Sequence, residues 1–316
     1  MSIRESHDGK RPLAVLTGPT GTGKTDFALR LAREFPLEIV SVDSAQVYRG
    51  LDIGSAKPDA SVRAAVPHHL IDLVEPTQSY SAGQFVRDAI AAIADIESRG
   101  RVPLLVGGTM LYLRALIGGI ATLPQGSAGI RAALDADAAR IGWPAMHQRL
   151  AEVDAAAAAR IHPNDTQRIQ RALEVHAATG EAISDLQART RSPLQRDFVC
   201  VAMIPADRAR LHAALAQRFD AMMAAGLLDE VRGLHRRGDL SDENPAIRAV
   251  GYRQLWVHLE GGCTLAVAVE RAVAATRQLA KRQLTWLRTM PNIEVFDPHD
   301  SQSFVGVRES LSASFG

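Results

Sequence analysis

The sequence predicts an α/β protein with a parallel sheet and a helical insertion. Strand and helix signals alternate over the first hundred residues, the pattern of parallel strands joined by crossover helices. A glycine-rich loop separates the first strand from the first helix. Later the chain becomes rich in alanine and arginine and loses its strand signals. These observations predict a core of residues 11–122 and 197–316 around a helical domain of residues 123–196.

Three short apolar runs predict the first strands of the sheet. They cover residues 13–17, 39–42 and 102–106, and glycine follows the first and the third. Before the third run, Ser81 and Gln84 have the spacing of a helix capping box, and apolar residues continue at helical spacing until a glycine. A crossover helix is therefore expected between the second and third of these strands.

The second half of the core begins with an apolar run at residues 198–204, which predicts another buried strand. More helices are expected as far as Met290, and the final stretch is expected to be peripheral. We find no internal repeat of the length that builds solenoids. A helical insertion inside an α/β core is the economical interpretation of this order.

The composition limits the class of partner. The 316 residues include 36 Lys plus Arg and 35 Asp plus Glu, so the net charge is +1. This excludes indiscriminate binding to nucleic acid through excess positive charge, but it permits a local basic patch. Two cysteines are too few for a disulfide framework, and no apolar run is long enough to span a membrane. Because no signal-peptide pattern is present, we expect a cytoplasmic protein with no membrane partner.

The glycine-rich loop matches the phosphate-binding motif G-x-x-x-x-G-K-[ST] and lies between a strand and an amphipathic helix, as the motif requires. In such a loop, backbone N–H groups converge on phosphate oxygens and the lysine reaches the terminal phosphate. The motif predicts a P-loop NTPase-like core with a diphosphate or polyphosphate ligand. Nucleotide binding, including ATP binding, is typical of this class, but the loop alone does not decide it. The loop residues are Gly18, Pro19, Thr20, Gly21, Thr22, Gly23, Lys24 and Thr25, with Thr25 as the expected Mg²⁺ ligand.

Asp43 is a well-placed carboxylate near this loop. It follows the second strand, and ligands bind at the carboxyl edge of open parallel sheets. The third strand ends in two glycines and Thr109, so it lacks the aspartate with which a nucleotide hydrolase binds its metal. Asp43 is therefore a candidate general base or metal ligand. A turn cap, formed together with Ser44, is the alternative.

Longer blocks resemble the tRNA dimethylallyltransferase family, whose members are also called tRNA isopentenyltransferases. The blocks keep their order across nearly the whole chain. They are GPTGTGKT (18–25), SVDSAQVYRGLDIGSAKP (41–58), PHHLID (67–72), LVGGTMLY (105–112), RIHPNDTQRIQRALEV (160–175), QRFDAMMAAGLLDEV (217–231), IRAVGYRQLW (247–256) and TRQLAKRQLTWLR (276–288). Ser55 stands where the family often has threonine, and the zinc finger of the eukaryotic type is missing, which points to the bacterial type.

The resemblance implies a reaction. Such enzymes transfer the dimethylallyl group from dimethylallyl diphosphate to N6 of the adenosine immediately 3′ of the anticodon, release diphosphate and require Mg²⁺. Asp43 is then expected to be the general base, Thr109 to bind the adenosine, and Lys24 and Arg218 to bind the diphosphate. General-base catalysis is typically worth about 10²–10⁴-fold in rate. Without the resemblance, the alternatives are a helix N-cap for Thr109, which is compatible with function, and a solvated helix arginine for Arg218.

The resemblance also implies that the anticodon stem-loop of tRNA is held between the core and the insertion. For residues 167–171, the alternative to tRNA contact is a helix face that is merely solvated. The residues expected to contact tRNA are Asp43, Ser44, Ala45, Gln46, Thr109, Arg131, Gln167, Arg168, Ile169, Gln170, Arg171, Arg248, Ala249, Val250, Gly251, Tyr252, Arg253, Lys281, Arg282, Gln283, Leu284, Thr285, Trp286, Leu287 and Arg288.

Residues 268–290 favour a nucleic-acid partner on their own pattern. At 100° per residue, the cations fall in one arc and most apolar residues in the other. The segment carries a net charge of +4, so the rest of the chain sums to −3. A membrane surface is less favoured, because interfacial helices have a more exposed apolar face. Phosphate contact is preferred over a merely solvated face. The cations are Arg271, Arg277, Lys281, Arg282 and Arg288.

Three other functions fit parts of the sequence. A small-molecule kinase would use Asp43 as a base towards a hydroxyl, and a prenyltransferase for free adenine nucleotides would use the same core. Neither needs an arginine-bearing insertion and a basic helix. A tRNA-binding regulator with a degenerate site is disfavoured because Lys24, Thr25 and Asp43 are all present. We therefore expect a monomeric enzyme whose partners are tRNA and dimethylallyl diphosphate.

Overall fold

The computed structural model describes residues 11–121, 123 and 127–315. The chain divides into a core unit, up to residue 117 and from residue 194, and a helical unit of residues 118–193. The helical unit begins five residues and ends three residues before the boundaries predicted from the sequence. The difference at its start arises because the last core helix before the insertion, α4 (Met110–Gly118), already ends at Gly118. The change in composition comes only later.

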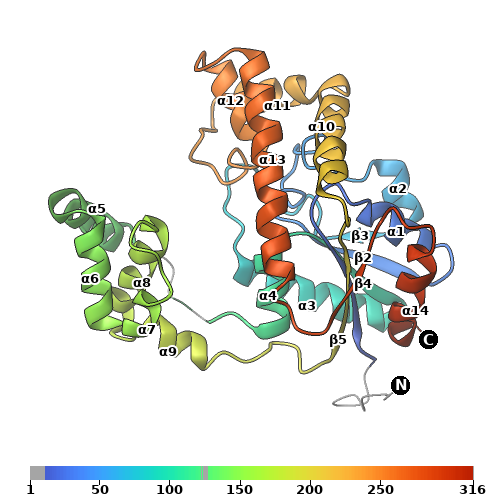
Figure 1. Ribbon diagram of the computed structural model, residues 1–316, viewed down its shortest axis with the longest axis horizontal. Coiled ribbons are helices and arrows are strands. Elements are labelled where there is room, and N and C mark those ends of the chain that lie inside the picture. The colour runs from blue at the N-terminus through green and yellow to red at the C-terminus, as the bar shows by residue number, and fades with distance from the viewer. Residues whose placement is uncertain (1–10, 122, 124–126, 316) are drawn as a thin grey trace. The chain divides into compact units, whose positions relative to one another are not determined.

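The core unit is built on a sheet whose strands are β1 (Leu13–Thr17), β2 (Leu37–Val42), β3 (His68–His69), β4 (Val102–Gly107), β5 (Phe198–Met203) and β6 (Ile293–Phe296). Their order is β3-β2-β4-β1-β5-β6, and every neighbouring pair is parallel (Figure 1). This confirms the predicted α/β class. Because β1, β2 and β4 are adjacent or one strand apart, the loops at their carboxyl ends meet at one edge of the sheet.

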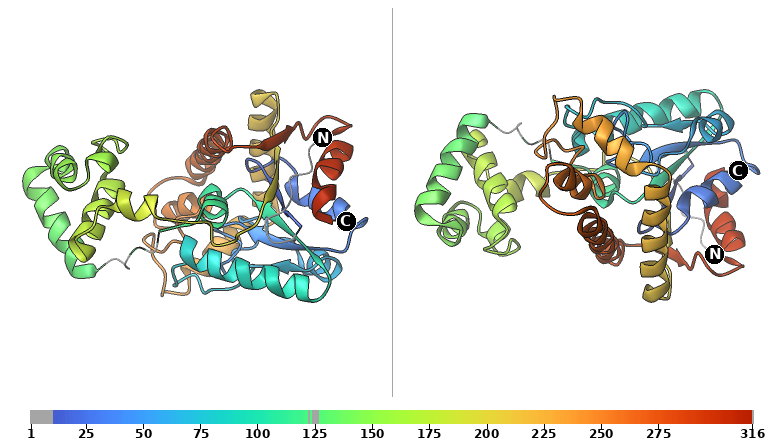
Figure 2. Two further views of the ribbon diagram at one scale, coloured as in Figure 1. Left: turned by 90° about the horizontal axis from the view of Figure 1, so that it is seen from below. Right: turned by 90° about the horizontal axis from the view of Figure 1, so that it is seen from above.

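Helices cover both faces of the sheet, so its strands are apolar on both sides. The helices of the core unit are α1 (Lys24–Leu31), α2 (Ala60–Ala65), α3 (Ala82–Ser98), α4, α10 (Arg208–Ala224), α11 (Leu227–His235), α12 (Tyr252–Leu259), α13 (Leu265–Leu287) and α14 (Ser303–Phe315). α3 and α4 pack on one face, and α1 and α14 on the other (Figure 2). α10 to α13 pack together with the segment that follows β2.

The predicted capping box is present at the start of α3. The Ser81 hydroxyl accepts a hydrogen bond from the backbone N–H of Gln84 at 3.2 Å. The Gln84 side chain accepts one from the backbone N–H of Ser81 at 2.8 Å. These bonds satisfy two N–H groups that would otherwise lack partners at the helix start.

The final stretch of the chain is not peripheral, so that expectation was wrong. β6 extends the sheet beyond β5, and α14 buries Val307, Leu311 and Phe315 against the sheet. The strand signal was weak because β6 is a short edge strand whose Val295 is 55% exposed. The four-residue spacing of the buried side chains in α14 was the signal that sequence reasoning missed.

The helical unit has a core of its own, formed by residues such as Leu134, Met146, Leu150, Ile169 and Val175. Among its described residues there is no strand, in agreement with the composition of this region. Its helices are α5 (Ala128–Ile141), α6 (Trp143–Val153), α7 (Ala155–Ala158), α8 (Thr166–Thr179) and α9 (Ile183–Ala188).

Candidate active site

The phosphate-binding loop connects β1 to α1 and depends on its glycines. Gly21 and Gly23 have left-handed backbone conformations, with φ of 80° and 71°. A Cβ atom on Gly18 would lie 2.5 Å from the carbonyl oxygen of Met203, so the close approach of β5 requires glycine there. The loop therefore has the compact, concave backbone that presents N–H groups to an anion.

Lys24 is the first residue of α1, and its ammonium group reaches back over the loop. Its Nζ donates a hydrogen bond to the Pro19 carbonyl at 2.7 Å. The pKa of Lys24 is lowered to about 7: burial is the largest cause and the nearby positive charge of Arg218 adds to it, whereas Asp43 acts in the opposite direction. Lys24 therefore changes its charge near neutral pH.

Arg218 brings a second cation to the loop. It lies on α10, and its Nη1 donates a hydrogen bond to the Thr20 hydroxyl at 3.1 Å. Burial lowers the pKa of Arg218, and Asp43 partly offsets this effect. Since its side chain is partly buried and bonded to the loop, the alternative of a freely solvated helix arginine does not hold.

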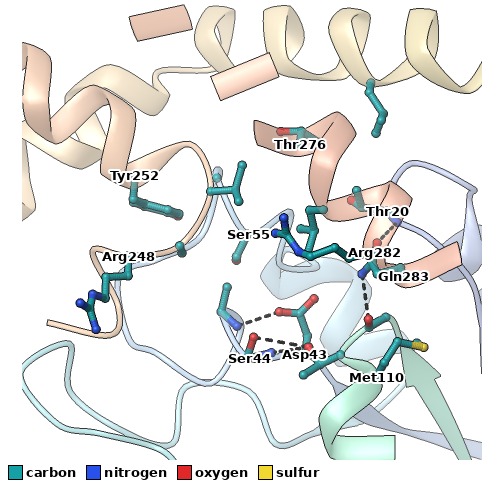
Figure 3. A pocket seen from close by; sticks show the side chains of 18 of the residues that line it. Thr20, Asp43, Ser44, Ser55, Met110, Arg248, Tyr252, Thr276, Arg282 and Gln283 are labelled. Atoms are coloured by element: carbon teal, nitrogen blue, oxygen red, sulfur yellow. Dashed lines mark hydrogen bonds between the residues drawn. The ribbon is translucent and has the colours of Figure 1, made fainter. Parts of the chain in front are cut away.

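Asp43 follows β2 and points into the pocket beside the loop (Figure 3). Its Oδ1 accepts hydrogen bonds from the backbone N–H groups of Ala45 at 2.8 Å and Gln46 at 3.3 Å. Among the described residues, Oδ2 has no hydrogen-bond partner. Asp43 thus caps the turn with one oxygen and keeps the other for a ligand, so the cap and the functional role are compatible.

Thr109 follows β4 and holds the turn that carries Asp43. Its backbone N–H donates to the Val42 carbonyl at 3.1 Å, and its hydroxyl accepts from the backbone N–H of Ser44 at 3.0 Å. A Cβ atom on Gly107 would lie 2.2 Å from the Val42 carbonyl oxygen, which explains glycine at this position. The hydroxyl therefore links two strand ends, rather than serving only as a cap for α4.

A cavity of about 420 Å³ lies between these groups (Figure 3). Thr20, Asp43, Thr109 and Arg218 form its polar part. Its apolar part is lined by side chains that α10, α13 and the loop before α12 contribute: Leu215, Phe219, Met222, Val250 and Leu279. The cavity thus suits a ligand with an anionic end and an apolar end.

A smaller cavity of about 100 Å³ adjoins the phosphate loop and shares Asp43 and Arg218 with the larger one. Lys24, Thr25 and Ser41 also line it. The hydroxyls of Thr25 and Ser41 and the carboxylate of Asp43 offer hard oxygen atoms, which Mg²⁺ binds together with waters and phosphate oxygens. Among the described residues, no group of three or more His, Cys, Asp and Glu side chains is arranged to hold a metal by itself.

Comparisons with known proteins identify the family of the chain. The model of the IPP transferase family matches residues 46–290, and that of the isopentenyl transferase family matches residues 12–71. A tRNA dimethylallyltransferase of Bordetella petrii is 54% identical over 289 residues, which cover 90% of this chain and 92% of that protein. The chain belongs to the tRNA dimethylallyltransferase family.

Solved structures agree with the membership of this family. The full-length tRNA isopentenylpyrophosphate transferase of Bacillus halodurans is 35% identical, with a TM-score of 0.70, and the match covers 97% of each chain. A eukaryotic dimethylallyltransferase acting on tRNA is 26% identical, with a TM-score of 0.81, over 96% of this chain and 78% of that chain. The P-loop NTPase-like core predicted from the sequence is thus shared with these proteins.

The basic face predicted for the last long helix is exposed on α13 of this family member. Arg271, Arg277, Lys281, Arg282 and Arg288 are all exposed. Among the described residues, none of the five takes part in an ion pair. Arg282 and Trp286 also line the larger cavity, so the basic face adjoins the site. No helix within the described ranges has the length and apolarity needed to cross a bilayer.

Residues 248–253 lie around the start of α12. Arg248 and Arg253 are exposed, and Arg248, Ala249 and Val250 line the larger cavity. Tyr252 is fully buried, and its hydroxyl donates to Glu230 at 2.6 Å. The two arginines are therefore available to a ligand, whereas the Tyr252 ring is a wall of the cavity.

In the helical unit, two of the expected tRNA-contacting arginines share one buried carboxylate. Arg131 of α5 and Arg171 of α8 lie 3.3 Å and 2.9 Å from the carboxylate of Glu174. The Gln170 side chain donates to Asp135 at 2.6 Å, and Arg168 is exposed at the start of α8. The shared contact with Glu174 thus holds the side chains of Arg131 and Arg171 together on α5 and α8. Gln167 is also exposed.

Besides Tyr252, three side chains in the expected tRNA-contacting segments are buried. Ile169 fills the core of the helical unit, and Leu287 fills a cluster beneath α13. Gln283 faces the phosphate loop. Helical periodicity turns Ile169 and Leu287 away from the exposed face, whereas Gln283 also lines both cavities. Leu284 is partly buried, and Thr285 is exposed.

Sequence reasoning missed Glu230 of α11, which supports one wall of the larger cavity. Its carboxylate accepts hydrogen bonds from the backbone N–H groups of Asp52 at 3.1 Å, Ile53 at 2.8 Å and Gly54 at 3.3 Å. A Cβ atom on Gly54 would lie 2.6 Å from the Tyr252 ring. Glu230 is the last residue but one of the block QRFDAMMAAGLLDEV, but nothing local to that block reveals a bond to a loop so distant in sequence.

The lowered pKa of Lys24 predicts that diphosphate binding takes up a proton. A bound anion favours the charged ammonium, so the pKa of Lys24 rises on binding and affinity falls as pH increases above the free value of about 7. Uptake by Lys24 should be about 0.9 proton at pH 8 and about 0.1 at pH 6. Calorimetry with inorganic diphosphate in two buffers of different ionisation enthalpy measures it.

The control for this measurement is Lys24→Arg, which stays charged throughout and should bind diphosphate without the Lys24-linked uptake. Equal proton uptake by the wild-type protein and the variant at pH 8 would show that Lys24 is already protonated in the free protein.

Proposed function

We propose that this protein transfers the dimethylallyl group from dimethylallyl diphosphate to N6 of the adenosine immediately 3′ of the anticodon in tRNA. The observation that carries the proposal is a pair of adjoining cavities that share Asp43 and Arg218: the smaller one lies at the phosphate loop with Lys24, and the larger one is lined by apolar side chains. Membership of the tRNA dimethylallyltransferase family supports the same reaction. A nucleotide is not needed as donor, because the loop serves the diphosphate of the prenyl substrate.

In the proposed reaction, the N6 lone pair attacks C1 of the dimethylallyl group. The C1–N6 bond forms while the C1–O bond breaks, and the electron pair of that bond leaves with diphosphate. Oδ2 of Asp43 takes the N6 proton, which makes the amino group a better nucleophile as the bond forms. Because Oδ1 is held by the turn, the orientation of Asp43 is fixed before the substrate arrives.

The leaving group is stabilised where its charge develops. Lys24 and Arg218 are cations that line the smaller cavity, and the loop N–H groups add partial positive charge. Thr25, which also lines the smaller cavity, fits a Mg²⁺ site at the diphosphate, and the ion would neutralise part of the diphosphate charge. In the desolvated pocket, such interactions strengthen as the bond to diphosphate breaks.

The adenosine and the tRNA that carries it would bind on the polar side of the cavity. Asp43 and Ser44 line this cavity and Gln46 lines the smaller one, and base-modifying enzymes draw their target base out of its stack. The exposed cations of α13 are proposed to contact phosphates of the anticodon stem-loop. We also propose that a monomer in the cytoplasm carries out the reaction.

The test is to incubate the protein with unmodified tRNA, Mg²⁺ and labelled dimethylallyl diphosphate. Label should appear on the adenosine 3′ of the anticodon, and a tRNA with guanosine at that position should stay unlabelled. ATP in place of the prenyl donor should give no turnover. Label at another nucleotide, or none with any tRNA, would refute the proposed function.

A further inference from the structure

Gln283 differs from its neighbours in the basic segment of α13. Lys281 and Arg282 are exposed, whereas Gln283 is only 8% exposed and faces the phosphate loop (Figure 3). Buried amide side chains are costly unless both their ends are hydrogen-bonded. The partners of this amide therefore show what the residue does.

Both ends of the Gln283 amide form hydrogen bonds, and each partner accepts only one orientation of the amide. Its Oε1 accepts from the backbone N–H of Thr20 at 3.0 Å, and its Nε2 donates to the Gly108 carbonyl at 2.8 Å. Because one partner is a donor and the other an acceptor, the amide can face only one way. A Cβ atom on Gly108 would lie 2.6 Å from Nε2, so a side chain at that position would displace the amide.

The two partners belong to opposite halves of the site. Thr20 lies in the phosphate loop, and its hydroxyl is held by Arg218. Gly108 precedes Thr109, whose hydroxyl holds the turn that carries Asp43. One side chain thus joins the group that binds the leaving diphosphate to the group that places the base.

The sheet alone does not fix this spacing. The parallel pairing of β1 with β4 ends at Thr17 and Gly107, where the Thr17 hydroxyl also donates to the Gly107 carbonyl at 2.9 Å. Beyond that pair the two segments are loops, and Gln283 is the side chain bonded to both. Misplacement of reacting groups by about 1 Å can cost on the order of 10²-fold in rate.

We infer that Gln283 is a positioning residue that sets the distance between the diphosphate end and the nucleophile end of the site. This inference rests on the proposed function. It separates Gln283 from the cations of the same helix segment: they are proposed to contact tRNA, whereas Gln283, although it lines both cavities, acts through its hydrogen bonds to Thr20 and Gly108.

The test compares Gln283→Met with the wild-type protein. Methionine keeps the length of the side chain and removes both hydrogen bonds. kcat should fall by about 10–100-fold, while the Kd for tRNA and the slope of its salt dependence stay unchanged. Gln302→Met is the matched control, because Gln302 is exposed and outside both cavities, and it should keep the wild-type kcat.

A second variant covers the case in which Gln283→Met is unstable. Gln283→Asn keeps a polar amide but is one methylene shorter, so it cannot reach both partners, and kcat should fall here too. A wild-type kcat in Gln283→Asn, or weakened tRNA binding with an intact kcat in either variant, would overturn the inference. Absence of prenyl transfer by the wild-type protein would instead refute the proposed function, so the two failures are distinguishable.

Discussion

Asp43→Asn should lower kcat by about 10²–10⁴-fold while the Kd for tRNA stays within about twofold of the wild-type value. Asparagine keeps the side-chain oxygen that accepts from Ala45 and Gln46, so the turn after β2 should remain intact. What the variant lacks is a basic oxygen for the N6 proton. Steady-state and single-turnover assays with saturating tRNA and dimethylallyl diphosphate measure the loss in the chemical step.

Asp242→Asn provides the matched control, since it makes the same chemical change at an exposed residue that lines neither cavity. Its kcat should equal that of the wild-type protein. If Asp43→Asn turned over at nearly the normal rate, Asp43 would have no role as a base, and its purpose would be to cap the turn.

The parts of the site that were predictable from sequence are those with local signals. The phosphate loop is a contiguous motif between a strand and a helix, and Asp43 and Thr109 each follow an apolar run. Parallel strands bring their carboxyl ends to one edge, so these residues meet without further information. The exposed arc of α13 was also predictable, because helical periodicity alone separates its cations from its apolar side chains.

The parts that were not predictable depend on contacts between distant segments. Gln283 bonds to Thr20 across 263 residues of sequence, and Glu230 bonds to Ile53 across 177. Gln283 lies among cations, so its segment suggested a surface role, and only its place on the helix turns it inward. β6 was missed for a related reason: its pairing with β5 makes it a strand, and its own sequence is too short to indicate one.

The cations of α13 should dominate the affinity for tRNA. Reversing two of them, in Lys281→Glu with Arg288→Glu, should reduce the slope of log Kd against log salt concentration by about 2, because each phosphate contact contributes nearly one unit. Affinity at low salt should fall most, since screening already weakens these contacts at high salt. Binding of labelled tRNA at several salt concentrations measures both effects.

The matched control is the double variant Arg33→Glu with Arg87→Glu. Both arginines are exposed and outside the cavities, and among the described residues neither forms an ion pair, so the net charge changes equally. If tRNA were attracted only by the overall charge of the protein, both pairs would lower affinity alike. A net charge of +1 makes that attraction weak, so the position of the charge should decide, and only the α13 pair should change the salt slope. Equal slopes for the two double variants would show that α13 does not contact the tRNA phosphates.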